Sequence, residues 1–135
     1  MRLIAGLGFR AGCRVDSLRL ALQAALRAAS AREGQEFTLA HISRLATAAD
    51  KAQHPALVQL ATELHLPIHP VSLPTLAKTP SSPSGYVPDR YGNHSVAESG
   101  ALAAAGPGAT LLGCRSISPD HMATAALASI ENTSP

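Results

Sequence analysis

Short apolar runs separated by polar segments recur along the chain and fit buried strands. The first run is RLIAGLG, which leads into glycines, and it is followed by EFTLAHIS at 36–43, PIHPVS at 67–72 and ATLLGCR at 109–115. Thr and Phe favour a strand at 36–43, because β-branched and aromatic side chains suit a pleated sheet. The pattern predicts four strands that are distant from one another in the sequence.

Residues with helical spacing lie between these runs. Leu18, Leu22 and Leu26 are spaced by four and form one stripe that faces a core. Asp16 or Ser17 is placed to cap this helix, because a side-chain oxygen at its start accepts a hydrogen bond from an otherwise unpaired amide. The sequence thus predicts an amphipathic helix soon after the first strand.

Two further helices are predicted. Pro55 suits the first turn of a helix through ALVQLATELHL, which Pro67 ends. SVAESGALAAAG is expected to be a helix with Ser95 as its cap and Glu98 at the capping-box position.

In the last segment, SPDHMATAALASI, the alanines and the Ser-Pro-Asp start favour a helix, with a terminal strand as the alternative. Strands that alternate with helices predict an α/β layered domain.

A long segment, KTPSSPSGYVPDRYGN at 78–93, precedes the last of these helices. Its Pro, Ser and Gly content excludes regular secondary structure. A loop of this length in a small domain is more often functional or disordered than incidental. Tyr86, Arg90 and Tyr91 are therefore candidates for covering a ligand.

Composition narrows the class of protein. The chain has 135 residues, enough for one compact domain, and its 46% hydrophobic and 15% charged residues indicate a globular protein. Aromatic residues make up 3%, Trp is absent and the net charge is +2, which argues against a nucleic-acid surface. No apolar stretch is long enough to cross a membrane. Arg10 and Arg14 interrupt what would be the apolar part of a signal peptide, so we expect a cytoplasmic protein with reduced cysteines.

The stretch GLGFRAGCR, from Gly6 to Arg14, is the first candidate for chemistry. Its Gly-x-Gly-x-x-x-Gly spacing, after a strand and before a helix, suits a dinucleotide-binding turn, and Arg44 at the end of the second strand suits the 2′-phosphate of NADP. Against that interpretation, the expected helix cap lies well past the glycines. The alternative is a tight glycine turn with solvated arginines.

Other polar residues are weaker candidates. Asp50 and Lys51 follow the second strand, and ligands of α/β sheets gather beyond the carboxyl ends of strands, although a solvated pair is the commoner outcome. Glu98 has a structural role in the capping box. His65 and His69 are four apart, but the proline between them breaks the helix on which that spacing would align two metal ligands. No metal site is therefore expected.

Taken together, these segments resemble the CobE and CbiG C-terminal family of cobalamin biosynthesis proteins. The matching features keep their order along nearly the whole chain. They are GLGFRAG, like the family's Gly-x-Gly-x-Arg-x-Gly opening; LATAADKAQHPALVQLATELHLPI, like a segment LAS…D-K before a Leu-rich helix and a short strand; SVAESGALAAAG, like SVAEAAAL; and MATAALA, like a Thr-Val-Ala-type terminal strand. The chain departs from the family where TAAD replaces a more usual Ser-Ile-Asp-type sequence, and in its Pro/Ser-rich loop.

The resemblance implies one three-layer α/β/α domain over residues 1–135, with a central mixed, mostly parallel sheet and with the last segment as a strand. It also implies a role in making the corrin ring. CbiG proteins open a δ-lactone on a cobalt-corrinoid intermediate and release a two-carbon fragment as acetaldehyde, an activity of a longer protein with further N-terminal domains. The expected partners are a corrinoid intermediate and other enzymes of the pathway, and no cofactor is expected.

A corrin precursor is a large apolar macrocycle edged with acetate and propionate carboxylates. Arg10 and Arg14 on the glycine loop would pair with those carboxylates, and bare backbone amides would add to the cradle. The remaining residues expected to bind the ligand are Gly6, Gly8, Phe9, Gly12, Arg44, Lys51 and Ser95.

Three functions follow from these interpretations. In the favoured one the protein binds a corrinoid without changing it, as a carrier or accessory module that passes labile intermediates between enzymes. In the alternative it is a hydrolase of lactone opening and acetaldehyde release, with Asp50 or Glu98 as the catalytic general base. An NADP-binding domain is the third interpretation.

Overall fold

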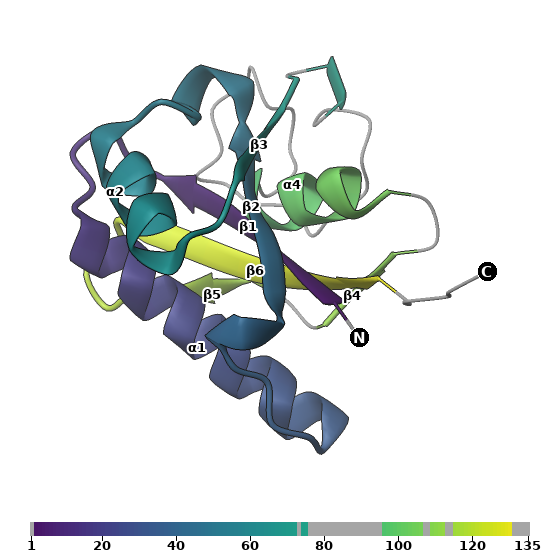
Figure 1. The fold of residues 1–135 in the computed structure, drawn as a ribbon. Coiled ribbons are helices and arrows are strands. Elements are labelled where there is room, and N and C mark those ends of the chain that lie inside the picture. The colour runs from purple at the N-terminus through teal and green to yellow at the C-terminus, as the bar shows by residue number, and fades with distance from the viewer. Residues whose placement is uncertain (1, 73, 76–95, 107–108, 113–114, 131–135) are drawn as a thin grey trace.

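A mixed β-sheet forms the centre of the molecule (Figure 1). The structure is a computed structural model, and it describes residues 2–72, 74–75, 96–106, 109–112 and 115–130. Six strands in this part of the chain pair in the order β3-β2-β1-β6-β4, with β5 also on β6. The strands are β1 (Arg2–Phe9), β2 (Ile42–Ala48), β3 (Ile68–Val71), β4 (Thr110–Leu111), β5 (Ser116–Ile117) and β6 (Ala123–Ile130).

The two halves of the sheet differ in strand direction. β1 pairs with β2, and β2 pairs with β3, in parallel. β6 runs antiparallel to β1, β4 and β5. The mixed sheet is therefore confirmed. Its parallel part is the half formed by β1, β2 and β3, whereas every pairing of β6 within the described residues is antiparallel.

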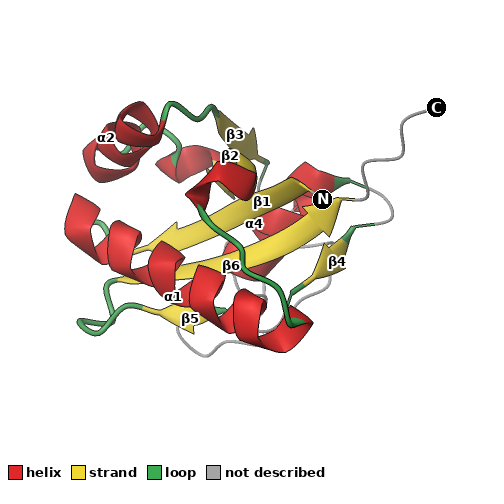
Figure 2. Cartoon of the chain, turned by 60° about the horizontal axis from the view of Figure 1, so that its bottom comes forward, coloured by secondary structure: helices red, strands yellow, loops and turns green. Residues whose placement is uncertain are grey.

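Helices cover both faces of the sheet (Figure 2). α1 (Val15–Glu33) and α2 (Pro55–Leu64) pack on one face, and α4 (Val96–Ala105) packs on the other. A strand that is buried on both sides needs a layer on each, and β1 is buried at every residue from Leu3 to Gly8. The three-layer α/β/α fold is confirmed.

The leucine stripe predicted from the sequence builds the larger core. Leu18, Leu22 and Leu26 of α1 are buried in one cluster with Leu3 and Leu7 of β1. Burial of each leucine side chain contributes about 1.5–3 kcal/mol. The apolar face of α1 therefore fixes how the helix that follows β1 lies on the sheet.

The second strand lies further along the chain than predicted. It is β2, and a short 3-10 helix (Leu39–His41) occupies part of the segment 36–43. The β preference of Thr and Phe is outweighed by burial, because Leu45 is fully buried and pairs with both β1 and β3. Arg44 is therefore inside the strand, and its expected position at the strand end is wrong.

The last segment is a strand, and the helix favoured by its composition is wrong. β6 pairs with β1 along its whole length, so the sheet provides partners for its backbone. Ala123, Ala125, Ala126 and Ala128 are buried, and their small side chains let α1 and α4 pack closely on the two faces. Tertiary pairing overrides the helix propensity of alanine, and the terminal strand implied by the resemblance is confirmed.

Two other boundaries differ from the expectation. α1 begins at Val15, and its N-cap is Arg14, which forms no side-chain cap hydrogen bond. Asp16 and Ser17 lie inside the first turn, so the expected cap is wrong. In the described part of the run ATLLGCR, residues 109–112 and 115, the strand β4 has two residues, and β5 was not predicted. The loop 78–93 lies outside the described residues.

Candidate functional site

Several segments in which the sequence predicted functional residues meet where β1 and β2 end. β1 leads into Arg10–Arg14, which we call the β1–α1 loop, and then into α1. β2 leads into a 3-10 helix, Ala49–Lys51, and then into α2. α4 also begins here, because a Cβ built on Gly8 would lie 3.4 Å from Cβ of Val96. The helices thus direct the positive ends of their dipoles towards the carboxyl edge of the sheet, where α/β proteins bind ligands.

Carbonyl groups at the β1–α1 loop are bound by side chains from the segment between β2 and α2. Lys51 Nζ donates to the carbonyl oxygen of Phe9, at the end of β1, at 2.7 Å. His54 Nε2 donates to the carbonyl oxygen of Ala11 at 2.7 Å. These two side chains bind carbonyl oxygens that would otherwise repel an anion. They also connect the β1–α1 loop to the segment between β2 and α2.

Three of the five amides of the loop have no hydrogen-bond partner among the residues that the structure describes. The Cys13 amide donates to the carbonyl oxygen of Arg10 at 3.0 Å, which closes a tight turn. In the described part of the chain, the amides of Ala11, Gly12 and Arg14 donate to no protein group. Amides without a protein acceptor at the start of a helix suit an anion. The loop therefore offers three backbone hydrogen-bond donors.

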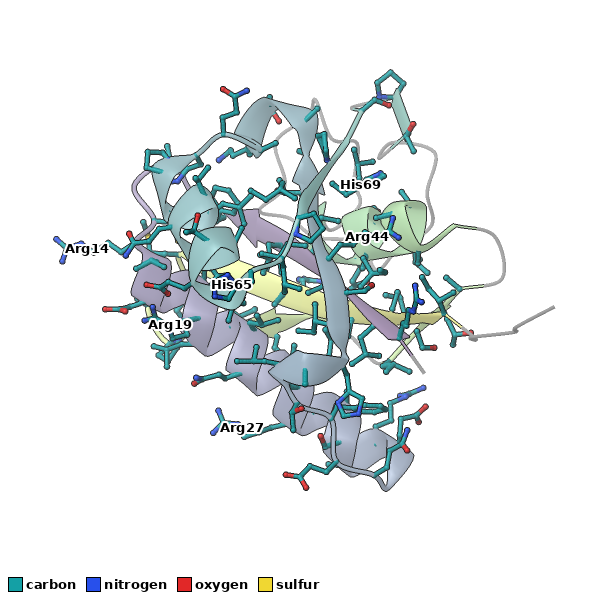
Figure 3. The ribbon with its side chains drawn as sticks, in the orientation of Figure 1. Arg14, Arg19, Arg27, Arg44, His65 and His69 are labelled. Atoms are coloured by element: carbon teal, nitrogen blue, oxygen red, sulfur yellow. The ribbon has the colours of Figure 1, made fainter. Side chains whose placement is uncertain are left out.

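The two arginines of the loop add positive charge beside these amides. Arg10 and Arg14 are exposed, and neither forms an ion pair with a described residue. Arg14 extends outwards beside the start of α1 (Figure 3). Arg19, further along the same helix, is paired with Asp16 and Glu63. The guanidinium groups of the loop, unlike that of Arg19, are available to an external carboxylate.

His54 is a residue of this region that the sequence did not single out. Its ring meets the ring of Phe9 edge-on at 71°, with centroids 5.0 Å apart, and Lys51 Nζ lies 5.3 Å from the centroid of Phe9. Nδ1 of His54 accepts a hydrogen bond from the Ala56 amide at 3.2 Å and so caps α2. An accepting Nδ1 and a donating Nε2 assign the neutral tautomer that is protonated on Nε2. The one signal in the sequence is its place before Pro55, the first residue of α2.

Asp120 is a second residue missed from the sequence, and it secures the start of α1. Its carboxylate accepts hydrogen bonds from Ser17 Oγ, from Ser118 Oγ at 2.6 Å and from the Met122 amide at 3.1 Å. These bonds, with that from Ser118 the largest cause, lower the pKa of Asp120 to about 2. Burial, and after it the charge of Asp120, raises the pKa of the Cys13 thiol. The thiol therefore stays protonated and poorly nucleophilic at neutral pH.

The two carboxylates considered for catalysis lie in different surroundings. Glu98 is fully buried in α4, and its carboxylate accepts hydrogen bonds from the Arg115 amide at 2.9 Å and from Arg115 Nη1 at 3.4 Å. These bonds tie α4 to the segment before β5. Asp50 is exposed in the 3-10 helix after β2. Ser95, the expected capping partner of Glu98, lies outside the described residues.

The structure brings together part of the predicted ligand-binding set. These members lie in the β1–α1 loop or against it: Phe9, Arg10, Gly12, Arg14 and Lys51. Gly6 and Gly8 are buried in β1 beneath α4, and a Cβ on Gly6 would lie 1.9 Å from the carbonyl oxygen of Ala97. Arg44 lies in the first half of β2, and Figure 3 shows it well apart from Arg14.

In the ranges that the structure describes, no three His, Cys, Asp or Glu side chains are grouped to hold a metal. His65 and His69 are exposed, and His65 ends α2 with a positive φ of 56° (Figure 3). None of the helices in those ranges has the length and apolar character needed to cross a membrane.

Comparison with known proteins agrees with the resemblance drawn from the sequence. The family model for the cobalamin synthesis G C-terminus matches residues 3–128. A crystal structure of CobE, a protein from the cobalamin (vitamin B12) biosynthetic pathway, is similar at 35% identity and a TM-score of 0.77, over 98% of this chain and 93% of CobE. The cobalamin biosynthesis protein chiG from Agrobacterium tumefaciens is 34% identical with a TM-score of 0.63, over 96% of this chain and 99% of its own.

A more distant structure shares the fold. It is described as a homolog of cobalamin biosynthesis protein G from Sulfolobus solfataricus, with 17% identity and a TM-score of 0.70 over 97% of this chain, which spans 37% of that protein. A search of curated proteins gave no match. The family model covers most of the chain, and two solved relatives exceed one third identity over nearly their whole length. The chain therefore belongs to the cobalamin synthesis G C-terminal family and is a protein of cobalamin biosynthesis.

Proposed function

We propose that the chain binds a corrinoid intermediate at the β1–α1 loop and releases it unchanged, as a carrier or accessory module. One observation carries the proposal, and it is the division of the polar groups at this loop. Three of its five carbonyls, those of Arg10, Ala11 and Arg14, accept hydrogen bonds within the protein. Three of its amides and the guanidinium groups of Arg10 and Arg14 have no partner among the described residues. Such a surface is complementary to carboxylates.

The chemistry of a corrin intermediate matches this surface. Acetate and propionate carboxylates surround an apolar ring, and a carboxylate accepts hydrogen bonds from a guanidinium group and from backbone amides. Each charge-assisted hydrogen bond contributes roughly 1.5–3 kcal/mol. A micromolar dissociation constant corresponds to about 8 kcal/mol. A few such bonds and some apolar contact therefore supply the moderate affinity that a carrier needs, because it must also release its ligand.

A hydrolase is the alternative, and the two carboxylates give it less support. A general base must reach the proton that it removes and must have a lone pair for it. Glu98 is fully buried and already accepts hydrogen bonds from Arg115. Asp50 is exposed on the 3-10 helix that follows β2, which is a common position for a solvated carboxylate.

An NADP-binding function has less support as well. The glycines of a dinucleotide turn let the pyrophosphate approach the backbone. At Gly6 and Gly8 the space beside the backbone is taken by α4. Arg44, the residue considered for the 2′-phosphate, lies within β2 and away from the loop.

An anaerobic titration followed by mass spectrometry of the released ligand tests the proposal. The probe is dicyanocobyrinic acid, a cobalt corrin with free acetate and propionate carboxyl groups. We expect a saturable spectral shift and an unchanged ligand mass, and failure to bind contradicts the proposal. The same measurement on a corrinoid δ-lactone tests the hydrolase, which requires a changed ligand mass and release of acetaldehyde.

A pair of double variants assigns the binding to the loop. Arg10→Ala with Arg14→Ala is expected to weaken binding of the probe by at least about 100-fold, because two charge-assisted contacts are lost. Arg27→Ala with Arg32→Ala removes the same charge from exposed positions further along α1 and is expected to change the affinity by less than about threefold, since solvent and salt screen distant charges. Equal losses in the two double variants would assign the effect to net charge and contradict a site at the loop.

A further inference from the structure

We propose that His54 is a positioning residue of the corrinoid site, which holds the Ala11–Gly12 peptide so that the Gly12 amide remains available to the ligand. The inference rests on the proposed function of the β1–α1 loop, and it adds a residue that lies outside this loop. It follows from a side chain whose two ring nitrogens both bind backbone groups, in two separate segments.

The imidazole of His54 joins the start of α2 to the β1–α1 loop. Nδ1 accepts from the Ala56 amide at 3.2 Å, and Nε2 donates to the Ala11 carbonyl oxygen at 2.7 Å. The edge-on contact with the Phe9 ring, at 5.0 Å between centroids, restrains the plane of the imidazole. Lys51 holds the Phe9 carbonyl oxygen at 2.7 Å. Two donors that follow β2 thus fix the carbonyl at the end of β1 and the carbonyl two residues further along the chain.

The hydrogen bond to Ala11 also decides where the next amide points. A trans peptide is planar, so the carbonyl of Ala11 and the N–H of Gly12 point in opposite directions. A carbonyl turned towards His54 therefore leaves the Gly12 amide directed away from it. Glycine restricts the rotation of a neighbouring peptide less than any other residue. Without His54 this peptide is free to turn and to place an oxygen where a carboxylate binds.

A helix cap alone does not account for a histidine at this position. Ser, Thr, Asp and Asn are the preferred caps, because a short side chain with one acceptor oxygen is sufficient. Histidine adds a second polar atom further from the backbone, and at His54 this atom reaches a carbonyl 43 residues away in the sequence. The contact with Ala11 is therefore a feature that capping does not require.

Two substitutions separate the cap from the contact with the loop. In His54→Asn the side-chain oxygen takes the place of Nδ1 and keeps the cap, but the side chain is too short to reach Ala11. In His54→Gln the side-chain nitrogen takes the place of Nε2 and keeps the donor to Ala11, while the cap is lost. The Asn variant is expected to unfold at the temperature of the parent and to bind dicyanocobyrinic acid about tenfold more weakly. The Gln variant is expected to unfold at a lower temperature and to bind within about threefold of the parent.

A measurement on the protein without ligand separates this inference from the proposed function. In proton–nitrogen correlation spectra, the Gly12 amide is expected to give one sharp resonance in the parent and in His54→Gln. In His54→Asn the resonance is expected to shift or broaden, because the peptide samples a second orientation. An unchanged Gly12 resonance in His54→Asn overturns the inference, whether or not the protein binds a corrinoid.

The binding results have equally definite meanings. The inference is overturned if His54→Asn binds the probe as tightly as the parent. It is overturned as well if the affinities of the two variants follow their unfolding temperatures, since this outcome leaves His54 with a structural role alone. Failure of the parent to bind the probe contradicts the proposed function, and it removes the site that His54 would position.

Discussion

Gly6 and Gly12 belong to one glycine-rich stretch, and they have opposite surroundings. A Cβ on Gly6 would lie 1.9 Å from the carbonyl oxygen of Ala97 and 2.6 Å from the amide of Ala101, so the missing side chain lets α4 pack directly on β1. A Cβ on Gly12 would meet Met122 Cε at 3.6 Å, which is an ordinary contact. Among the described residues, packing therefore requires glycine at the first position and not at the second.

The spacing of glycines along the chain therefore does not by itself mark one site. Gly6 is buried within the sheet, and its side of the backbone is filled by a helix. Gly12 is exposed in a loop where its own amide and those of Ala11 and Arg14 have no acceptor among the described residues. A single motif thus contains one glycine that serves helix–sheet packing and one whose bare backbone is open to a ligand. The dinucleotide interpretation has less support, because it treats both as parts of the same turn.

Substitution at Gly6 should give the largest effect. In Gly6→Ala the new methyl group clashes with the backbone of α4, which cannot move aside as a flexible side chain can. We expect a loss of about 3 kcal/mol or more in the free energy of unfolding, measured by chemical denaturation with Gly12→Ala as the matched control. A variant as stable as the parent would show that α4 does not pack on Gly6.

Substitution at Gly12 should separate stability from binding. Gly12→Ala has room for its methyl group, so we expect a free energy of unfolding equal to that of the parent or higher by up to about 1 kcal/mol. Binding of dicyanocobyrinic acid should weaken about tenfold, because the methyl group hinders a close approach to the loop amides. The methyl ester of the probe controls for contacts that need no carboxylate. Unchanged affinity for the free acid would place the ligand elsewhere.

The stability that Asp120 contributes at the start of α1 should depend on pH, whereas the stability that the Gly6 contact contributes should not. The pKa of Asp120 is lowered from its ordinary 3.8 to about 2, so the stability that its ionised form contributes is complete above roughly pH 4 and is lost as the pH falls towards 2. The difference in thermal midpoint between the parent and Asp120→Asn should therefore shrink through this range. Glu33→Gln, an exposed change at the end of α1, is the control. A difference that stays constant from pH 5 to pH 2 would contradict the assigned hydrogen bonds.

Local patterns were sufficient for the elements whose partners lie nearby. The stripe of Leu18, Leu22 and Leu26 predicted α1, because each leucine faces the sheet at helical spacing. The strand expected at 36–43 and the helix expected at the C-terminus were wrong, since pairing with β1 decides both. The sequence does not show which segment will pair with β1, and intrinsic propensities are smaller than the free energy of a fully paired, buried strand.

The sequence predicted the charged residues of the candidate site but not the residues that hold its loop in place. Arg10 and Arg14 stand out because they interrupt an otherwise apolar and glycine-rich stretch. His54 acts through a carbonyl 43 residues away, and Asp120 through a hydroxyl 103 residues away, so neither contact leaves a pattern in the sequence. Residues that position a loop through its backbone are the hardest to predict, because a backbone carbonyl is the same at every position.

The most direct test of corrinoid binding at the β1–α1 loop is a titration of the labelled protein with dicyanocobyrinic acid, followed residue by residue in proton–nitrogen correlation spectra. The ligand is diamagnetic, so a shift reports contact or hydrogen bonding rather than an unpaired electron. If carboxylates bind at the loop, we expect saturable shifts that are largest at the amides of Ala11, Gly12 and Arg14, and we expect the methyl ester of the probe not to produce them. Largest shifts at the opposite end of the sheet, or equal shifts with the ester, would contradict binding at this loop.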